Sequence, residues 1–395
     1  MTAPRTFPEG PLAGVTVIEF CSVAAGPFCG MLLADMGARV VKVEPPAGDA
    51  LRQWPPITDG FSENFLSLNR NKQSITLDLK APEDNDIAVR LIESADVVIE
   101  NNRPGVMDRL GLGHAKFARA RPDLIYCSLS AFGQNGPRAK QGGFDVTVQA
   151  ISGIMSVTGE PEGGPVKCGV PVSDFATGLY GAFAVATLIA RVRAEGRGGF
   201  IDISMLGASL GISALQTSEY FGGGKDPRRL GAAHPRNAPY EAFRASDAHF
   251  VIAAGNDKLW RAVCDVVKMP DLAADPRFVS TSDRAANQAA LKEILNAAFA
   301  ADKARAWLDR FEAAGVPCAP INRYSEVLAD AQTREMGWVR EVDLPSGART
   351  RTFASPLRID GEAPPIRNSA PGLDADREAV LNMLEAAPRR SKAAE

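Results

Sequence analysis

The chain of 395 residues lacks the cysteine and charge patterns on which several functional classes depend. Its six cysteines lie in mostly apolar stretches, and no two of them have CxxC spacing. This disfavours a metal knuckle and favours buried free thiols in a reducing compartment. The formal net charge is only −3. The chain therefore has no general field that would attract nucleic acid or anionic lipid, and an anionic ligand must be held by local basic groups.

The sequence also lacks the signals of secretion and of membrane insertion. Its first fourteen residues contain neither a basic n-region nor an apolar h-region, so they do not form a signal peptide. The longest uncharged apolar run lies between Asp174 and Arg191, and it is shorter than the ~20 residues that a transmembrane helix requires. We therefore expect a buried helix after Asp174 and a soluble, cytoplasmic protein with no membrane partner.

Short apolar strands alternate with helical segments in the first part of the chain. Residues 15–20 and 38–44 have the pattern of strands, and the helical segment 27–37 separates them. A strand, a helix and a strand within about 30 residues predict a βαβ unit with parallel strands. Further strands are expected at the segments 95–101, 124–133 and 200–206. The pattern predicts an α/β fold with a doubly wound, Rossmann-like sheet.

The sequence pattern changes after this expected sheet. The Gly-, Pro- and Arg-rich segment 221–240 indicates a linker or an active-site loop. We expect a large domain formed by 1–210 and 336–395, a linker at 211–224 and a smaller α+β domain at 225–335. The last eight residues, PRRSKAAE, are expected to be disordered.

The first loop, CSVAAGPFCG at residues 21–30, lacks the GxGxxG fingerprint of a dinucleotide-binding crossover. Pro27 directly follows Gly26, and the glycines that make room for a pyrophosphate are missing. Glu44 does stand where a ribose-binding acid would lie. A nicotinamide dehydrogenase therefore remains a fallback, and on local signals alone the loop could be a plain strand-to-helix connection.

Several uncommon motifs follow one another along the chain. They are AAGPFCGMLLADMGARVVKVEPPAGDALRQW, NRNKQSITLDLK, ENNRPGVMDRLGLG, YCSLSAFGQNGP, GGFDVTVQAISGIMSVTG and GVPVSDFATGLYGAFAVATLIARVRAEGRGGFIDISML. In these motifs and in their order the chain resembles the class III CoA-transferase family, which includes formyl-CoA transferase, carnitine CoA-transferase and the α-methylacyl-CoA racemases. Segment 229–243 resembles most closely the transferases of the hydroxymethylglutarate and glutarate type, which handle succinyl-CoA and dicarboxylates. The resemblance implies an interlocked homodimer that needs no metal or tightly bound cofactor and uses coenzyme A as a substrate.

Asp174 lies in the segment PVSDFATG, at the start of the apolar helix. On local signals alone the Ser-Asp pair predicts a helix N-cap, where the helix dipole would keep the carboxylate ionised. The resemblance matches Asp174 to the catalytic aspartate of the family. That aspartate attacks the thioester carbonyl as a covalent nucleophile and passes through an acyl-aspartyl anhydride and an aspartyl-CoA thioester.

The resemblance also implies which residues bind coenzyme A. Arg103 and Arg109 could form forked contacts with phosphate oxygens, and Lys80 offers a point charge. Arg109 could instead pair with a neighbouring acid. The full set is Val23, Ala24, Ala25, Leu77, Lys80, Asn101, Asn102, Arg103, Arg109, Gly142, Gly143, Phe144 and Asp145.

The sequence gives less information on which residues bind the acceptor acid. A second carboxylate requires a cation, for which Arg52, His234 and Arg236 are candidates, and Trp54 could form a wall of the substrate pocket. Trp54 could equally be a core residue, and His234 a surface-loop histidine. The Gly-rich loop that covers the aspartate in formyl-CoA transferase has no obvious counterpart, although 231–235 could take its place.

Two other functions remain open. The racemases of the family carry a His-Asp pair where this chain has Phe144 and Asp145, and a phenyl ring cannot exchange protons. α-Epimerisation of an acyl-CoA is therefore the second hypothesis, and Phe144 opposes it. The third is a non-catalytic CoA- or NAD-binding protein, which the retained Asp174 and the missing GxGxxG oppose.

Overall fold

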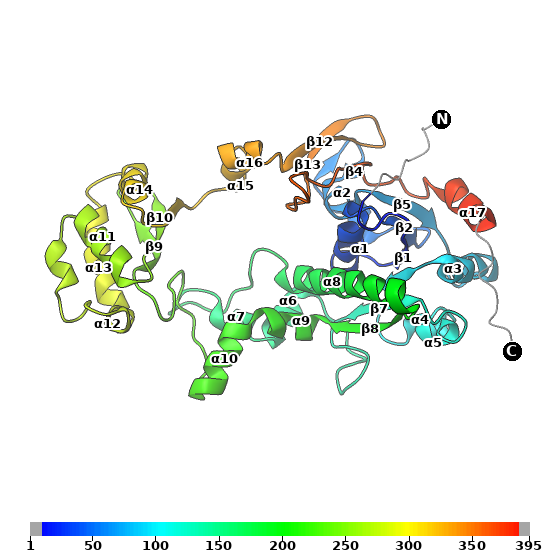
Figure 1. Ribbon diagram of the computed structural model, residues 1–395, viewed down its shortest axis with the longest axis horizontal. Helices are drawn as coiled ribbons and strands as arrows, with labels where there is room; N and C mark the ends of the chain where they lie inside the picture. The colour runs from blue at the N-terminus through cyan, green and yellow to red at the C-terminus, as the bar shows by residue number, and fades with distance from the viewer. Residues whose placement is uncertain (1–9, 387–395) are drawn as a thin grey trace. The chain divides into compact units, whose positions relative to one another are not determined.

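Residues 10–386 are described here from a computed structural model, in which the chain divides into two compact units (Figure 1). The larger unit extends to Ile154 and also contains Lys167–Gly224 and the segment from Gln332 onward. The smaller unit contains Met155–Val166 and Lys225–Ala331. It therefore includes a short segment that lies before the expected start of the small domain. The predicted disordered tail at 388–395 lies outside the described residues.

The larger unit is built on a six-stranded sheet in which all neighbouring strands are parallel. The strands are β1 (Thr16–Phe20), β2 (Arg39–Glu44), β5 (Lys72–Thr76), β6 (Val97–Glu100), β7 (Ile125–Ser130) and β8 (Gly199–Ser204), in the order β5-β2-β1-β6-β7-β8. This order places later strands on either side of β1, as in doubly wound sheets that bind nucleotides. The prediction of an α/β fold with parallel strands is confirmed. β5 was not predicted, because the polar residues Lys72–Ser74 interrupt its apolar pattern.

Helices cover both faces of this sheet. On one face α1 (Ala25–Asp35) and α8 (Val172–Glu195) pack in a buried cluster that includes Val17 of β1. On the opposite face α3 (Pro82–Ser94) and the C-terminal α17 (Arg377–Ala386) pack in a second cluster, which includes Ile18. Successive strand residues point to opposite faces, so burial of both faces requires nearly continuous apolar strands.

The larger unit also contains shorter helices and two small sheets. The β12–β13 pair is antiparallel, as is β3–β4. The segment expected as a linker at 211–224 is largely occupied by helix α10. These elements are β3 (Ile57–Thr58), β4 (Phe61–Ser62), α2 (Glu63–Asn69), α4 (Val106–Arg109), α5 (His114–Phe117), α6 (Asp145–Ile151), α9 (Met205–Ile212), α10 (Ala214–Gly223), α16 (Ala331–Glu335), β12 (Val339–Asp343) and β13 (Arg349–Phe353). Two further short helices, α7 (Ile154–Val157) and α15 (Tyr324–Val327), fall mainly in the smaller unit.

Helix α8 is the apolar helix predicted after Asp174, but only one side of it is buried. Val185 and Ile189 are buried against the sheet, whereas Leu179 and Phe183 are 54% and 71% exposed. The prediction of a buried helix is therefore wrong for the single chain, because the sheet covers only one side of the helix. Among the described residues, α8 is the one helix whose length and apolar composition would also suit a membrane span, and a third of its apolar window is buried.

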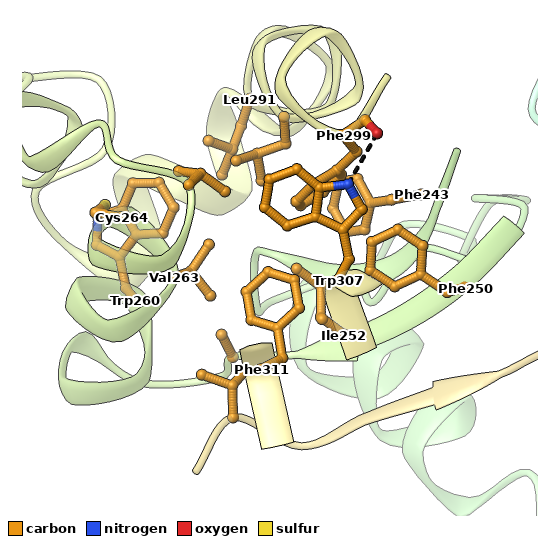
Figure 2. Packing of buried hydrophobic residues seen from close by; sticks show 14 of the residues in the cluster. Phe243, Phe250, Ile252, Trp260, Val263, Cys264, Leu291, Phe299, Trp307 and Phe311 are labelled. Atoms are coloured by element: carbon orange, nitrogen blue, oxygen red, sulfur yellow. Dashed lines mark hydrogen bonds between the residues drawn. The ribbon is translucent and has the colours of Figure 1, made fainter. Parts of the chain in front are cut away.

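The smaller unit combines an antiparallel sheet with helices. Its strands β9 (Tyr240–Arg244), β10 (His249–Ala253) and β11 (Cys318–Pro320) lie in the order β11-β10-β9. Figure 2 shows its core, in which the Trp307 indole N–H donates to the Phe299 carbonyl over 2.9 Å. Its helices are α11 (Asp257–Val266), α12 (Thr281–Ala286), α13 (Gln288–Phe299) and α14 (Ala304–Ala313).

Candidate active site

A pocket lies at the carboxyl ends of β1, β6 and β7, where the strand order reverses. β1 leads into Ser22–Ala25, β6 leads into Asn101–Pro104, and Ser130 ends β7; all of these residues line the pocket. Its cavity volume is about 210 Å³. In open parallel sheets, ligands bind in the crevice outside the strand ends at this reversal of order. The fold therefore independently predicts a ligand site at this position.

Ten of the residues predicted from the sequence line this one pocket. They come from four separate stretches of the chain, which the fold brings together. They are Val23, Ala24, Ala25, Asn101, Asn102, Arg103, Gly142, Gly143, Phe144 and Asp174. The sequence analysis did not identify the other lining residues, which are Ser22, Pro104, Leu129, Ser130, Ala131, Gln141 and Met205. Because the carboxyl ends of parallel strands lie at the same edge of a sheet, the residues that follow β7 could have been predicted to line the pocket.

Asp174 is the third residue of α8 and lies within its first turn. The helix begins at Val172 after Pro171, and no side chain caps it, so the local prediction that the Ser-Asp pair forms the N-cap is wrong. Gly178, one turn later, explains how Asp174 reaches the pocket. A Cβ atom at Gly178 would lie only 2.7 Å from the Ala25 carbonyl oxygen, so only glycine permits this approach of α8 to the start of α1.

The electrostatic environment of Asp174 is the reverse of the one expected. Burial, and secondly the negative charge of Asp145, raise the pKa of the Asp174 carboxyl from 3.8 to about 7. The helix N-terminus therefore does not keep the pKa low, as the sequence analysis expected, because desolvation and a like charge outweigh it. A carboxylate with such a pKa is more basic than an ordinary one and is about half ionised near neutral pH.

Asp145 lies outside the pocket lining, at the first residue of α6. One of its oxygens accepts a hydrogen bond of 3.0 Å from the backbone N–H of Ser173, and the other accepts one of 2.6 Å from the Gln149 side chain. Asp145 is thus fixed at the beginning of α8. The resemblance implies that Asp145 binds coenzyme A, whereas in the structure it contacts Ser173, the residue that precedes Asp174.

Asn101 and Asn102 tie the end of β6 to the loop after β1. The Asn101 side chain accepts from the Ser22 N–H over 3.0 Å and donates to the Ser22 carbonyl over 2.8 Å. The Asn102 amide donates to the Phe20 carbonyl over 3.2 Å. Both residues line the pocket, but these polar contacts hold the pocket wall together.

Arg103 is the cation of the pocket. Its side chain is exposed, and the residues from 10 to 386 provide no ion pair for it. A Cβ atom at Gly142 would lie 2.7 Å from an Arg103 guanidinium nitrogen, so the glycine leaves room for this side chain. Guanidinium groups bind phosphate oxygens through forked contacts, which suits an anionic ligand such as coenzyme A.

The other predicted site residues lie elsewhere in the structure. Leu77 is buried in the core beside α3, and Lys80 and Arg109 do not line the pocket. Trp54 is 48% exposed and is also outside it. Arg52 is fully engaged, since its guanidinium contacts both Glu44 carboxylate oxygens at 2.6 and 2.7 Å and donates to the Pro371 carbonyl.

His234 belongs to the smaller unit. Its Nδ1 atom accepts hydrogen bonds from the backbone N–H groups of Arg236 and Asn237, at 3.2 and 3.1 Å. Nε2 is therefore the nitrogen that carries the proton and could donate to a ligand. Burial and the Arg236 charge lower the pKa of His234. Within residues 10–386, no group of three or more His, Cys, Asp or Glu side chains is arranged to hold a metal ion.

Comparison with known proteins identifies the family of the chain. Residues 12–377 match the family described as CoA-transferase family III. The chain is 41% identical over 384 residues to the acetyl-CoA:oxalate CoA-transferase of Acetobacter aceti, covering 96% of this chain and 97% of that protein. It is 39% identical over 339 residues to the succinyl-CoA:glutarate CoA-transferase of Mus musculus, covering 85% and 78%. The crystal structure of a CAIB/BAIF family protein from Brucella suis superimposes with a TM-score of 0.85 at 36% identity, covering 95% and 99% of the two chains. The chain belongs to CoA-transferase family III, and it is a CoA-transferase.

Proposed function

We propose that this CoA-transferase moves CoA from a donor such as succinyl-CoA to a dicarboxylic acid through covalent intermediates on Asp174. The observation that carries the proposal is the position of Asp174, whose pKa is raised to about 7, in the pocket at the strand ends. A carboxylate that is both basic and partly desolvated can attack a thioester carbonyl.

The proposed reaction exchanges acyl bonds of similar energy in four steps. An Asp174 oxygen attacks the donor thioester, the C–S bond breaks, and CoA leaves as thiolate from an acyl-aspartyl anhydride. The thiolate then attacks the aspartyl carbonyl, which releases the donor acid and leaves an aspartyl-CoA thioester. The acceptor carboxylate attacks the carbonyl of this thioester, the C–S bond breaks, and CoA leaves as thiolate from a second anhydride that joins the acceptor to Asp174. The thiolate finally attacks the acceptor carbonyl, which restores the Asp174 carboxylate.

The named relatives support a dicarboxylic acceptor. The relatives named above are transferases for oxalate and glutarate, both of which carry two carboxylates. The second carboxylate of such an acid requires a hydrogen-bond donor or cation. Arg52 is engaged with Glu44, whereas the Nδ1 atom of His234 accepts from the chain and leaves Nε2 as the protonated nitrogen. We therefore favour His234, with Arg236 beside it, over Arg52 for this contact.

We also propose that the protein acts as a homodimer. Large apolar side chains are exposed along consecutive helices, and patches of this kind usually mark an interaction surface. They include Leu179, Phe183, Ile212, Leu215 and Phe221, on α8, α9 and α10. A second copy of the chain would cover the side of α8 that the sheet leaves exposed. The interlocked arrangement is proposed from the resemblance alone.

A trapping experiment tests the proposed mechanism. Incubation with an acyl-CoA followed by hydroxylamine is expected to convert Asp174 to a hydroxamate, because covalent catalysis leaves an electrophilic carbonyl on this residue. A racemase would leave the aspartate unmodified and exchange the substrate α-hydrogen with solvent deuterium. Phe144, which lines the pocket, provides no second base for that exchange. Deuterium incorporation at a catalytic rate without an aspartyl adduct would contradict the proposal.

A further inference from the structure

The loop after β1 has an unusual backbone conformation at the pocket. Val23 lies in the left-handed region with φ of 65°, although it is neither glycine nor in a regular element. This conformation is unfavourable for a β-branched residue and persists only where the surroundings enforce it. Val23, Ala24 and Ala25 all line the pocket, so the conformation of Val23 determines the position of part of its wall.

Lys42 and Asp49 hold the backbone on both sides of Ser22. The Lys42 ammonium is fully buried, donates to the Cys21 carbonyl over 2.7 Å and lies 2.9 Å from an Asp49 oxygen. The two Asp49 oxygens in turn accept from the Val23 N–H over 3.2 and 3.3 Å. The buried Lys42 ammonium thus holds Cys21 directly, and it holds Val23 through Asp49.

A second buried lysine contacts the first turn of α1, which directly follows the same loop. Lys72 donates to the Pro27 carbonyl over 2.8 Å and lies 2.8 Å from Glu19. Glu19 also lies 3.1 Å from Lys42, so it links the two ammonium groups. Burying charged groups has a large desolvation cost even when they are paired. The arrangement therefore needs an explanation beyond stability. Asp49 also accepts from the Leu51 N–H over 3.0 Å, but the contacts to the Cys21 carbonyl and the Val23 N–H act on the pocket loop itself.

We propose that Lys42 and Asp49 are positioning residues, which hold Val23 in its left-handed conformation and so set the shape of the acyl-CoA pocket. The proposal rests on the proposed function, in which this pocket binds the acyl-CoA. Neither residue lines the pocket, so neither is expected to contact the substrate. Their loss should therefore weaken the binding of acyl-CoA more than it slows the chemical steps at Asp174.

The first test is Asp49→Asn in the full-length enzyme, with steady-state kinetics at varied succinyl-CoA and calorimetric titration with free CoA. A charge-assisted hydrogen bond is lost, so KM and the dissociation constant should rise about tenfold or more, while kcat changes less. Asp35→Asn is the matched control, because Asp35 forms an equally buried pair with Arg70 at 2.6 Å, away from the loop. If Asp35→Asn raises KM as much, or Asp49→Asn leaves it unchanged, the proposal is wrong. Asp49→Glu replaces Asp49→Asn if that variant does not fold. It keeps the charge beside Lys42, but its longer side chain displaces the carboxylate from the Val23 N–H, so KM should again rise.

A double-mutant cycle separates positioning from general destabilisation. Glycine adopts positive φ without strain, so Val23→Gly should reduce the dependence of the loop on Asp49. The rise in KM caused by Asp49→Asn should be smaller in the Val23→Gly background than in the wild type. An equal rise in both backgrounds would overturn the proposal. The variant Arg103→Ala tests the proposed function separately, because Arg103 lines the pocket. If Arg103→Ala leaves the KM for acyl-CoA unchanged, the pocket is not the CoA site and the proposed function itself has failed.

Discussion

The carboxylate of Asp145 accepts a 3.0 Å hydrogen bond from the backbone N–H of Ser173, the residue that directly precedes Asp174. This contact occupies one of the free N–H groups at the start of α8, which would otherwise be available to stabilise the Asp174 carboxylate. It also places a second negative charge close enough to raise the pKa of Asp174. Asp145 thus both fixes the start of the helix and makes the nucleophile more basic.

Asp174→Ala should abolish CoA exchange while the protein still folds and binds CoA. Removal of a covalent nucleophile should lower kcat on the order of 10⁴-fold or more. Exchange between succinyl-CoA and labelled acceptor measures the activity, and calorimetry measures CoA binding. Glu195→Gln, at the exposed C-terminal end of the same helix, serves as the control. Turnover at the wild-type rate in Asp174→Ala would refute the mechanism.

The pH dependence should report the ionisation of Asp174. The nucleophile must be deprotonated, so kcat/KM for the acyl-CoA should rise by about tenfold per pH unit up to a midpoint near 7 and then level off. Asp145→Asn removes the repulsive charge and should shift this midpoint to lower pH. The shift should be partial, because burial is the larger cause of the raised pKa. An unchanged or higher midpoint in Asp145→Asn would show that the two carboxylates do not interact.

The same pKa shift predicts that Asp174 destabilises the folded state at neutral and alkaline pH. A carboxyl whose pKa is raised on folding stabilises the protein while it is protonated, and this contribution is lost as the pH rises from about 4 through about 7. Asp174→Asn should therefore raise Tm relative to wild type at about pH 8, and by clearly less at about pH 4.5. Differential scanning calorimetry of the apo protein at both values measures this. An equal increase in Tm at both pH values would mean that folding does not raise the pKa of Asp174.

Gly142→Ala should weaken acyl-CoA binding by displacing Arg103. The new methyl group would lie 2.7 Å from the guanidinium, so the side chain must move. The KM for acyl-CoA should rise by a few-fold, because the guanidinium is the flexible end of an exposed side chain and can shift, with a smaller change in kcat. Gly164→Ala is the control, because a Cβ atom there meets no neighbouring atom within 4 Å. If both variants behave alike, Arg103 is not held in place by Gly142.

Phe183→Arg should disrupt the proposed dimer. Phe183 is 71% exposed on the side of α8 that the sheet leaves uncovered, and a charge there would be costly to bury. Sedimentation velocity at micromolar concentration should show a loss of dimer. Val279→Arg, at a 51% exposed apolar residue outside these helices, should leave the oligomeric state unchanged. A wild-type protein that sediments as a monomer would contradict the assignment of this surface.

The residue pattern along the chain was enough to predict much of the fold and to identify Asp174 as the central residue of the site. The β-branched runs around Val17, Val40 and Val97 predict buried parallel strands, because a strand covered on both faces must be apolar at nearly every position. The motif order identifies the family, and with it Asp174 and most of the pocket wall. These features depend on residue types that are close in sequence.

Only the tertiary structure decided how these residues interact. Asp145 raises the pKa of Asp174 because α6 and α8 place the two carboxylates together, and sequence spacing carries no information on that distance. Lys42, Asp49 and Lys72 are charged residues of the kind that usually lies in solvent, yet the fold buries them beside the pocket loop. The exposure of Phe183 likewise depends on which side of α8 faces the sheet. Burial and through-space charge arise from packing between distant segments, so they emerge only when the chain is folded.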